Sequence, residues 1–367
     1  MSPGSLAPLA LIAELTHVCP LHCVYCSNPL ELDRRSTELS TEVWLRVVRE
    51  AAEAGVLQLD LTGGEPLARS DVIDVIKGAR GAGLYVNLIT SGLPLDEKRL
   101  DALLDANLDH IQLSFQGARE ESANEFSGTK AHAHKLRVLG WLKQRRIAVT
   151  LNFVIHRRNI DQIPEMLSIA ESSSANRVEF AHVQYYGWAF ANRQHLLPTR
   201  SQLDRSLEFL KVAKDRLRGK VQIEFVVPDY YAKYPKACMG GWGGKLILIA
   251  PNGDALPCHA GRIIPGLRFE NVKSHSLIDI WNNSEAFRKF RGESWMKEPC
   301  RSCERRGQDF GGCRCQALLV AQDAAVADPV CSLSPWRAAV DAILAEVNDP
   351  GSAWPAKPDW RYRSNPT

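Results

Sequence analysis

The sequence predicts an α/β protein: a partial barrel of six βα units followed by a smaller α+β domain. Two observations indicate this fold class. In the first two thirds of the 367 residues, short apolar runs alternate with helical patterns, and buried strands joined by helices form parallel sheets with right-handed crossovers. The ten cysteines fall into one group at 19–26 and another at 238–331, which indicates a separate set of metal or cluster ligands in each domain.

The barrel strands are expected in six apolar runs: Leu9–Leu15, Val56–Leu61, Leu84–Thr90, His110–Phe115, Ala148–Val154 and Val178–Val183. The first helix is expected to begin after the N-cap Ser40 and to end at Gly55. Further helices are expected at about 70–82, 96–106, 131–145, 160–173 and 201–217. Six units are too few for a closed eight-stranded barrel, so we expect an open one with its ligands at the C-terminal ends of the strands.

The pattern changes after residue 218. Two apolar runs, Lys245–Ala250 and Ala255–Cys258, flank a Pro-Asn-Gly-Asp turn and predict a β-hairpin. Short helices are expected near 276–291 and 316–322, with loops between them. We therefore expect a barrel domain at 1–218, a cysteine-rich domain at 219–337, and a disordered tail rich in proline and polar residues at 338–367.

Composition narrows the classes of partner. The formal net charge is only +3, so nothing in the charge balance calls for nucleic acid or an acidic membrane surface. No stretch is long and apolar enough to span a bilayer, and the N-terminus lacks the basic start of a signal peptide. We expect a cytoplasmic protein, where thiols stay reduced and ten cysteines are unlikely to form disulfides.

The first cysteine motif directly follows the first expected strand. Cys19, Cys23 and Cys26 have the spacing C-x3-C-x2-C. One face of a buried helix would show the same spacing, but Pro20 and Pro29 favour a loop. Three thiolates on a four-iron cluster leave one iron without a protein ligand. The amine and carboxylate of an amino acid could chelate that iron, whereas a single zinc ion would need a fourth ligand.

His17 or His22 could complete such a zinc site. The cysteine spacing, with Tyr25 before the last cysteine, nevertheless resembles the radical SAM superfamily. That resemblance implies a [4Fe–4S] cluster on the three cysteines, reductive cleavage of S-adenosylmethionine, and a place for Tyr25 against the adenine.

Polar motifs follow the later strands. The run Thr62-Gly63-Gly64-Glu65-Pro66 resembles the family's GGEP sequence, which contacts the methionine amine, although an ordinary βα turn would read similarly. Further polar residues at strand ends could hydrogen-bond a cofactor: Ser91, Ser114, Gln116 and Asn152. His132 and His134 do not share a helix face, and we expect both to be exposed to solvent.

The second cysteine group holds seven cysteines, too many for one all-cysteine zinc site, so two clusters fit better. Its spacing resembles the SPASM domain. The resemblance implies that auxiliary cluster I takes Cys238, Cys258, Cys313 and Cys315, and that auxiliary cluster II takes Cys300, Cys303, Cys331 and Asp309. Asp309 stands where the wider family has cysteine, so a carboxylate ligand is the hypothesis and an ordinary loop residue the alternative. Either auxiliary cluster could be [4Fe–4S] or [2Fe–2S].

Three strings narrow the resemblance further: ELTHVCPLHCVYCSNPLEL, DFGGCRCQALL and ADPVC resemble the PqqA peptide cyclases of pyrroloquinoline quinone biosynthesis. The resemblance covers most of the chain, from about residue 9 to 336. It implies a small peptide substrate, PqqA, presented by a chaperone-like partner, PqqD. It also implies a reaction that joins a glutamate γ-carbon to a tyrosine ring, a flavodoxin-like electron donor, and an auxiliary cluster that accepts the second electron.

Three rival interpretations remain at the level of sequence. Another SPASM peptide modifier, such as a sulfatase-maturing or thioether-forming enzyme, would be favoured by cysteine at position 309. A non-enzymatic electron-transfer iron–sulfur protein would leave the open iron and the Gly63–Pro66 run unused. A zinc-binding interaction module is the third.

Overall fold

The computed structural model describes residues 7–349, 355 and 358–366. One mixed sheet of nine strands runs through the molecule in the order β7-β6-β5-β4-β3-β2-β1-β8-β9. The strands are β1 (Ala10–Thr16), β2 (Gln58–Gly63), β3 (Tyr85–Thr90), β4 (His110–Phe115), β5 (Ala148–Ile155), β6 (Arg177–His182), β7 (Gln222–Val226), β8 (Leu246–Ile249) and β9 (Ala255–Leu256). All neighbours pair in parallel except β8 and β9.

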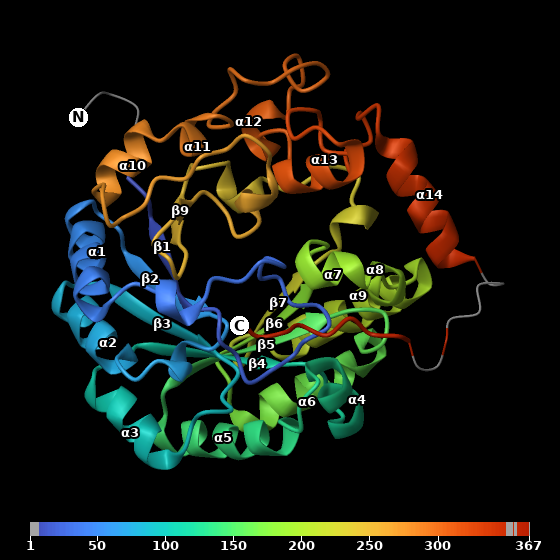
Figure 1. Cartoon of the computed structure of the whole chain (residues 1–367). Helices are drawn as coiled ribbons and strands as arrows, with labels where there is room; N and C mark the ends of the chain where they lie inside the picture. The colour runs from blue at the N-terminus through green and yellow to red at the C-terminus, as the bar shows by residue number, and fades with distance from the viewer. Residues whose placement is uncertain (1–6, 350–354, 356–357, 367) are drawn as a thin grey trace.

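Helices cover the outer face of the curved sheet (Figure 1). Those of the barrel are α1 (Thr41–Glu53), α2 (Val72–Gly81), α3 (Glu97–Asp105), α4 (Glu120–Ser127), α5 (His132–Arg145), α6 (Ile163–Ser173), α7 (Gly187–Ala191), α8 (Arg193–Leu196) and α9 (Arg200–Arg216). The later helices are α10 (Leu277–Asn283), α11 (Glu285–Arg288), α12 (Arg306–Asp309), α13 (Arg314–Ala321) and α14 (Arg337–Asn348). Within the part of the chain that the structure describes, no helix is long and apolar enough to cross a membrane.

The burial pattern of each strand follows its place in the sheet. β1 lies between β2 and β8, and its last six residues are all buried, as is usual for a central strand covered on both faces. Along β4, buried and half-buried residues alternate. The buried set packs against the helices, and the other set faces the barrel interior, where Gln112 and Ser114 lie. This alternation places polar side chains inside the barrel.

Helix α1 begins directly after Ser40, the N-cap that the sequence predicts. The side chain of Ser40 caps α1 by accepting a hydrogen bond from the Val43 amide. The apolar stripe of Trp44, Val47 and Val48 is fully buried against the sheet and α2. Burial of these side chains, each contributing about 1.5–3 kcal/mol, holds the helix on the barrel far more strongly than its intrinsic propensity does.

The hairpin of the second domain joins the barrel sheet directly. β8 pairs in parallel with β1, from Ala10 opposite Leu246 to Ala13 opposite Ile249. The sequence predicts the hairpin itself, which is confirmed by the antiparallel pairing of β8 with β9. The strand that precedes the first cysteine motif is therefore flanked by one strand from each domain.

The structure differs from the expectations in several places. The sheet continues past residue 218 into β7, which pairs with β6. This short edge strand alternates polar and apolar residues, which is a weak sequence signal. The segment expected to be a disordered tail begins with α14, whose Val340 and Val347 are buried. His132 is buried against Phe115 rather than exposed, with ring centroids 5.9 Å apart.

Candidate functional site

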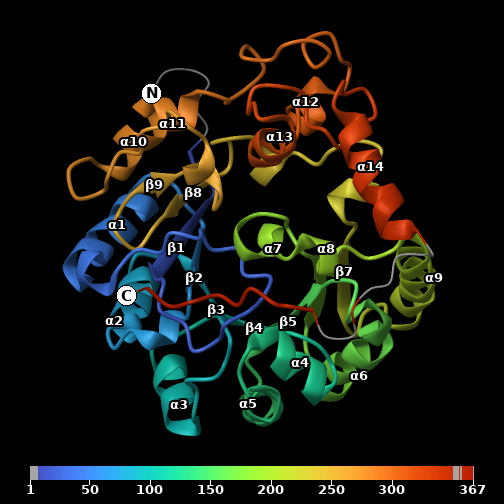
Figure 2. The ribbon, with the colours of Figure 1, turned by 45° about the vertical axis from the view of Figure 1, so that its right-hand side comes forward.

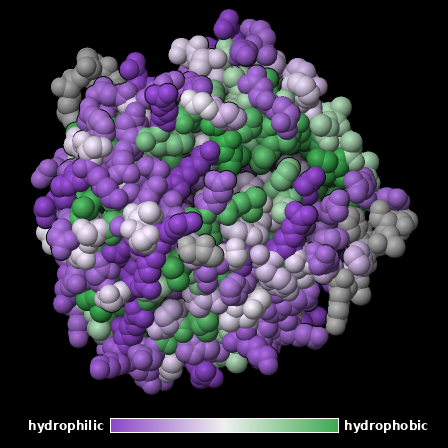
Figure 3. All heavy atoms as spheres, viewed as in Figure 1, coloured by the Kyte–Doolittle hydropathy of each residue, from purple (hydrophilic) through white to green (hydrophobic). Residues whose placement is uncertain are grey.

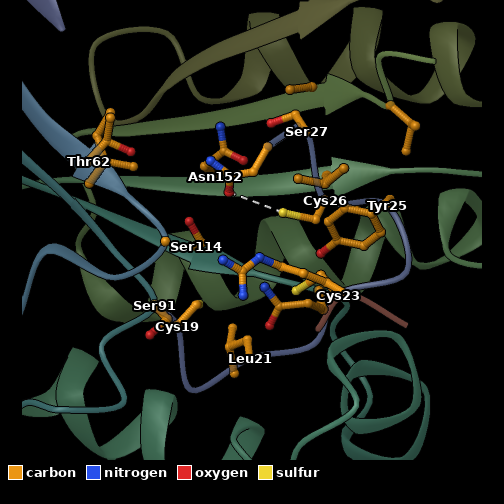
Figure 4. Close-up of a pocket in the computed structure, with 18 of the residues that line it drawn as sticks. Cys19, Leu21, Cys23, Tyr25, Cys26, Ser27, Thr62, Ser91, Ser114 and Asn152 are labelled. Carbon is orange, nitrogen blue, oxygen red and sulfur yellow. Dashed lines mark hydrogen bonds between the residues drawn. The ribbon is translucent and has the colours of Figure 1, made fainter. Parts of the chain in front are cut away.

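The first cysteine motif lies in an irregular loop after β1, so the helical alternative is wrong. Figure 4 shows Cys19, Cys23 and Cys26 around one cavity. This cavity, which we call the barrel cavity, has a volume of about 300 Å³ and lies at the C-terminal ends of the strands. The Cys26 thiol donates to Asn28 Oδ1 at 3.2 Å, drawn as a dashed line. A site at this edge of parallel strands is the position that the barrel fold favours for chemistry.

The three thiols have little in the protein alone to stabilise their charged forms. Burial raises the pKa of the Cys19 thiol to about 12 and raises the pKa of Cys23 and Cys26 above its ordinary value. A metal cluster supplies the positive charge that binds such groups as thiolates. In the described part of the chain, no three Cys, His, Asp or Glu side chains converge on one ion. Thiolates that bind different irons of a cluster do not need to converge, so this donor set fits a cluster.

The two glycines after β2 are required by backbone contacts with the cysteine loop. The Gly64 amide donates to Thr16 O at 2.6 Å, and the Glu65 amide donates to Val18 O at 2.8 Å. A Cβ atom on Gly63 would lie 2.3 Å from Thr16 O, and one on Gly64 would lie 2.4 Å from Val18 O. The glycines therefore lock the loop after β2 against the start of the cysteine loop.

Glu65 is fully buried and lies behind the cavity wall. Its carboxylate accepts from the amides of Leu67 and Ser91, at 3.1 and 2.8 Å, and from the hydroxyls of Thr90 and Ser91. These four donors occupy the carboxylate, so the structure makes it a brace between the ends of β2 and β3. The direct contact of Glu65 with a ligand ammonium that the sequence leads us to expect stays a prediction.

Most of the residues expected to contact S-adenosylmethionine line the barrel cavity. They are Tyr25, Gly63, Gly64, Ser91, Ser114 and Asn152, together with Gln116, whereas Glu65 and Pro66 do not line it. Figure 4 shows Thr62, Ser91, Ser114 and Asn152 around the same space as the thiols. A cavity of this size, with a few polar groups converging on it, suits a small organic ligand.

Sequence reasoning missed three residues of this site. His182, at the end of β6, lines the cavity, and neither ring nitrogen has a hydrogen-bond partner within the described residues. Burial lowers the pKa of His182 to about 3, so the ring is neutral and can donate and accept. Lys135 is buried behind Ser114, and Arg363 comes from the C-terminal end of the chain. His182 could have been found from the sequence, because ligands are expected at the C-terminal ends of the barrel strands and His182 ends β6. Lys135 and Arg363 belong to no motif, so the sequence offers no signal for them.

The Lys135 ammonium supports the cavity wall from behind. It donates to Ser114 O at 2.8 Å and to Gln116 Oε1 at 2.6 Å. Burial lowers the pKa of Lys135 to about 8, and the neighbouring Cys23 and Glu65 partly oppose this change. A cation so deeply buried beside a cavity lined by thiols favours negatively charged ligands there.

The second cysteine group separates into the two sets expected from the sequence. In the first set, the Sγ atoms of Cys258 and Cys315 lie 3.8 Å apart. Cys238 and Cys313 adjoin this pair, and hydrogen bonds from Cys238 and Cys315 lower the pKa of the Cys258 thiol. Four thiols that meet in one place match the expected ligands of auxiliary cluster I.

The second set lines a small separate cavity between the loops around α12. Cys300, Cys303, Asp309 and Cys331 all face it. Asp309 is 7% exposed, and its Oδ1 atom accepts from the Gly311 amide at 3.0 Å. Its other oxygen, Oδ2, lies 3.5 Å from the Arg305 guanidinium, and the carboxylate shares the wall of this cavity with three thiols.

A second cavity lies beside the barrel cavity and is lined by residues of both domains. This cavity, which we call the interdomain cavity, has a volume of about 550 Å³ and shares Ser27 and Tyr186 with the barrel cavity. Its other walls include Phe190 and Ile263. Tyr186 also packs against the apolar cluster that contains Cys258 and Cys315. Burial, and then the nearby Cys258, raise the pKa of the Tyr186 hydroxyl. Figure 3 shows hydrophobic residues gathered on the upper half of the face of the molecule that Figure 1 presents.

Comparisons with known proteins agree with both domains. The pattern of the Radical SAM superfamily matches residues 13–170, and that of the SPASM iron–sulfur cluster-binding domain matches residues 238–304. A curated protein of Methylobacterium nodulans named PqqA peptide cyclase is 52% identical over 366 residues, which cover 99% of this chain and 95% of that protein. A protein of the same name from Gluconobacter oxydans is 51% identical over 346 residues, covering 94% of this chain and 96% of that protein.

Solved structures share the fold at low sequence identity. Streptococcus suis SuiB bound to S-adenosylmethionine superposes with a TM-score of 0.75 at 19% identity, over 89% of this chain and 78% of that one. The structure of anSMEcpe with bound AdoMet gives a TM-score of 0.62 at 16% identity, over 93% of this chain and 96% of that one.

Proposed function

Because the chain belongs to the PqqA peptide cyclases, radical SAM enzymes with a SPASM iron–sulfur domain, we propose that it joins a glutamate γ-carbon to a tyrosine ring carbon within a PqqA peptide. One observation supports this most strongly. The barrel cavity, lined by three thiols, shares Ser27 and Tyr186 with a larger cavity that residues of both domains line. A peptide side chain in the larger cavity would face the small one.

The proposed cofactors follow from the donor sets. Cys19, Cys23 and Cys26 would hold a [4Fe–4S] cluster that, with S-adenosylmethionine bound, supplies a 5′-deoxyadenosyl radical able to take a hydrogen atom from an unactivated carbon. A carbon next to a carboxylate has no useful acidity at neutral pH, so acid–base side chains alone would not open that position. Cys238, Cys258, Cys313 and Cys315 would hold one auxiliary cluster. Cys300, Cys303, Asp309 and Cys331 would hold the other.

The protein's own residues orient the cosubstrate and exclude water. Thr62, Ser91, Ser114 and Asn152 present polar groups around the barrel cavity, and Tyr25 supplies an aromatic wall. His182 offers two unpaired ring nitrogens at the end of β6. Glu65 holds the ends of β2 and β3 together, so the Ser91 hydroxyl has one fixed direction.

The interdomain cavity suits a peptide substrate. Leu30, Phe190, Ile263 and Leu319 give it apolar walls, while Arg262 and His259 add polar groups. The guanidinium of Arg262 pairs with Asp33 at 3.1 Å and with Asp254 at 2.9 Å, which fixes it at the rim. We propose that the reacting glutamate and tyrosine enter here. A chaperone-like PqqD would present the peptide, and a flavodoxin-like donor would supply the first electron.

The test is anaerobic incubation of the cluster-loaded protein with dithionite, S-adenosylmethionine, PqqA and PqqD, followed by mass spectrometry. The expected result is loss of two hydrogens from PqqA, with fragment ions that locate a bond between glutamate and tyrosine, and formation of 5′-deoxyadenosine. Formation of 5′-deoxyadenosine with unchanged PqqA would refute the substrate and favour another peptide modifier. Formation of neither product by protein with intact clusters would refute the proposal as a whole.

A further inference from the structure

The last described residues, 358–366, form what we call the C-terminal segment. It follows α14 and runs back across the open end of the barrel to the cysteine loop, as the dark red chain in both views shows (Figure 1, Figure 2). Asn365 bonds the backbone of Cys19 twice: its Oδ1 atom accepts from the amide at 2.9 Å, and its Nδ2 atom donates to the carbonyl at 3.0 Å. The Arg363 carbonyl bonds to His22 Nδ1 at 2.7 Å. The segment is therefore hydrogen-bonded to the loop that carries the three thiols.

Arg363 points from this segment into the barrel cavity. Arg363 is only 2% exposed, and it lines the same cavity as Cys19, Cys23 and Cys26. One end of the guanidinium donates to Asn365 Oδ1 at 3.0 Å, and the other donates to His17 O. Its Nε atom is buried and has no acceptor within the described residues. A buried N–H without an acceptor is costly unless a ligand supplies one.

Arg363 places its positive charge at the wall of the cavity that the thiols of Cys19, Cys23 and Cys26 also line. A cation held at low exposure interacts with charges in the cavity much more strongly than it would in water.

Contacts upstream of Arg363 anchor the segment independently of its guanidinium. Trp360 Nε1 donates to Glu125 Oε1 at 2.8 Å, and the indole packs edge-on against Phe126 at 6.2 Å. Asn192 Nδ2 donates both to Val24 O at 2.7 Å and to Arg361 O at 2.8 Å. Replacement of the guanidinium alone should therefore leave the segment in place.

We propose that the C-terminal segment is a wall of the radical SAM site, in which Arg363 stabilises the reduced cluster and slows the loss of its iron. The proposal rests on Cys19, Cys23 and Cys26 as the cluster ligands. Reduction adds a negative charge to a cluster that three thiolates already make anionic, so a buried cation beside it favours the reduced form.

The experiment compares full-length, cluster-loaded wild type with R363Q, R363K and the control R361Q. Arg361 carries the same charge two residues earlier, but it is exposed. The midpoint potential is measured by anaerobic titration of the one EPR signal that changes on addition of S-adenosylmethionine, so the auxiliary clusters do not contribute. We expect R363Q to lower the equilibrium constant for reduction roughly tenfold, a shift of about −59 mV for one electron. R363K should shift it less, and R361Q should match wild type.

Iron loss is measured in the same proteins with a ferrous chelator. We expect R363Q to release the S-adenosylmethionine-responsive cluster roughly tenfold faster than R361Q, within the range found when residues that support metal ligands are removed. R363Q with the potential and the release rate of R361Q would overturn the proposal. These readouts do not need PqqA, so a failed cyclase assay with a shifted potential would refute the substrate and leave this inference intact.

A measurement on wild type covers the case in which R363Q does not load its cluster. Trypsin cleavage after Arg363 is followed by mass spectrometry with and without the clusters. A segment that closes on the cluster should be cut roughly tenfold more slowly when the cluster is present, because cleavage requires the segment to detach. Equal cleavage rates in the two forms would show that the segment does not respond to the cluster and would overturn the proposal.

Discussion

Asp309 is the one residue without a thiol in the proposed ligand set of auxiliary cluster II. Its carboxylate faces the same small cavity as Cys300, Cys303 and Cys331. The Gly311 amide holds one carboxylate oxygen, and Arg305 lies 3.5 Å from the other. An oxygen ligand is harder than a thiolate and gives its iron a different electronic environment. Ligation of iron by Asp309, which we propose, would therefore have a direct spectroscopic consequence.

We predict that D309A changes the EPR spectrum of one auxiliary cluster and leaves the signal that responds to S-adenosylmethionine unchanged. D309C should keep the iron content of wild type and lower the potential of that cluster, since an anionic thiolate donates more charge to iron. The exposed Glu304 offers a matched control in E304Q. Identical spectra for D309A and E304Q would mean that Asp309 is an ordinary loop residue.

Glu65 gives a second prediction for a single side chain. Each oxygen of its carboxylate accepts two hydrogen bonds from the ends of β2 and β3. In E65Q the side-chain NH2 group would face some of the amides and hydroxyls that donate to Glu65. These buried donors would be left without an acceptor, which destabilises the fold by about 1–3 kcal/mol. We expect a lower unfolding midpoint in urea and weaker binding of S-adenosylmethionine. Unchanged stability together with lost binding would instead indicate that the carboxylate contacts the ligand directly.

At the scale of elements, Glu14 connects β1 to the segment after β9. This buried carboxylate bonds to His259 Nδ1 at 2.9 Å and lies 3.4 Å from His17 Nε2. Burial would raise its pKa, but the two histidines more than offset this, so the pKa falls from 4.5 to about 2. A carboxylate with a lowered pKa stabilises the folded state fully above its unfolded pKa and loses that contribution as the pH falls through the folded one.

We therefore predict that Glu14 stabilises the fold by about 3 kcal/mol at pH 7, and that this contribution is lost between about pH 4.5 and pH 2. Urea unfolding followed by tryptophan fluorescence should show E14Q well below wild type at pH 7, with the gap narrowing at pH 4 and further at pH 3. The exposed Glu53 supplies the control E53Q, whose gap should stay near zero. A gap for E14Q that is constant with pH would contradict the assignment of the pKa shift.

At the scale of the whole molecule, the sequence predicts the parts that depend on local periodicity and strand order. The six expected barrel strands and the hairpin are present within a few residues, because buried parallel strands are apolar and ligands collect at their ends. The sequence does not predict that β8 pairs with β1 or that Arg363 reaches the cysteine loop. Both are contacts between residues more than 200 positions apart, and they leave no periodic signal.

The interdomain cavity depends on the assembly of both domains, and it gives the last prediction. Ile263 is a half-buried residue of its wall and comes from the cysteine-rich domain. In I263W the larger side chain would fill space that the peptide needs, and an overpacked contact of this kind costs about 1–3 kcal/mol, or roughly fivefold to 150-fold in peptide modification. Cleavage of S-adenosylmethionine in the absence of peptide should not change, because the barrel cavity keeps its own walls.

The control V212W adds the same bulk on α9 at a residue that is 70% exposed. Mass spectrometry of PqqA and of 5′-deoxyadenosine separates the two activities. Equal loss of both would place the effect on the cluster site, whereas full peptide modification by I263W would show that the substrate binds outside this cavity.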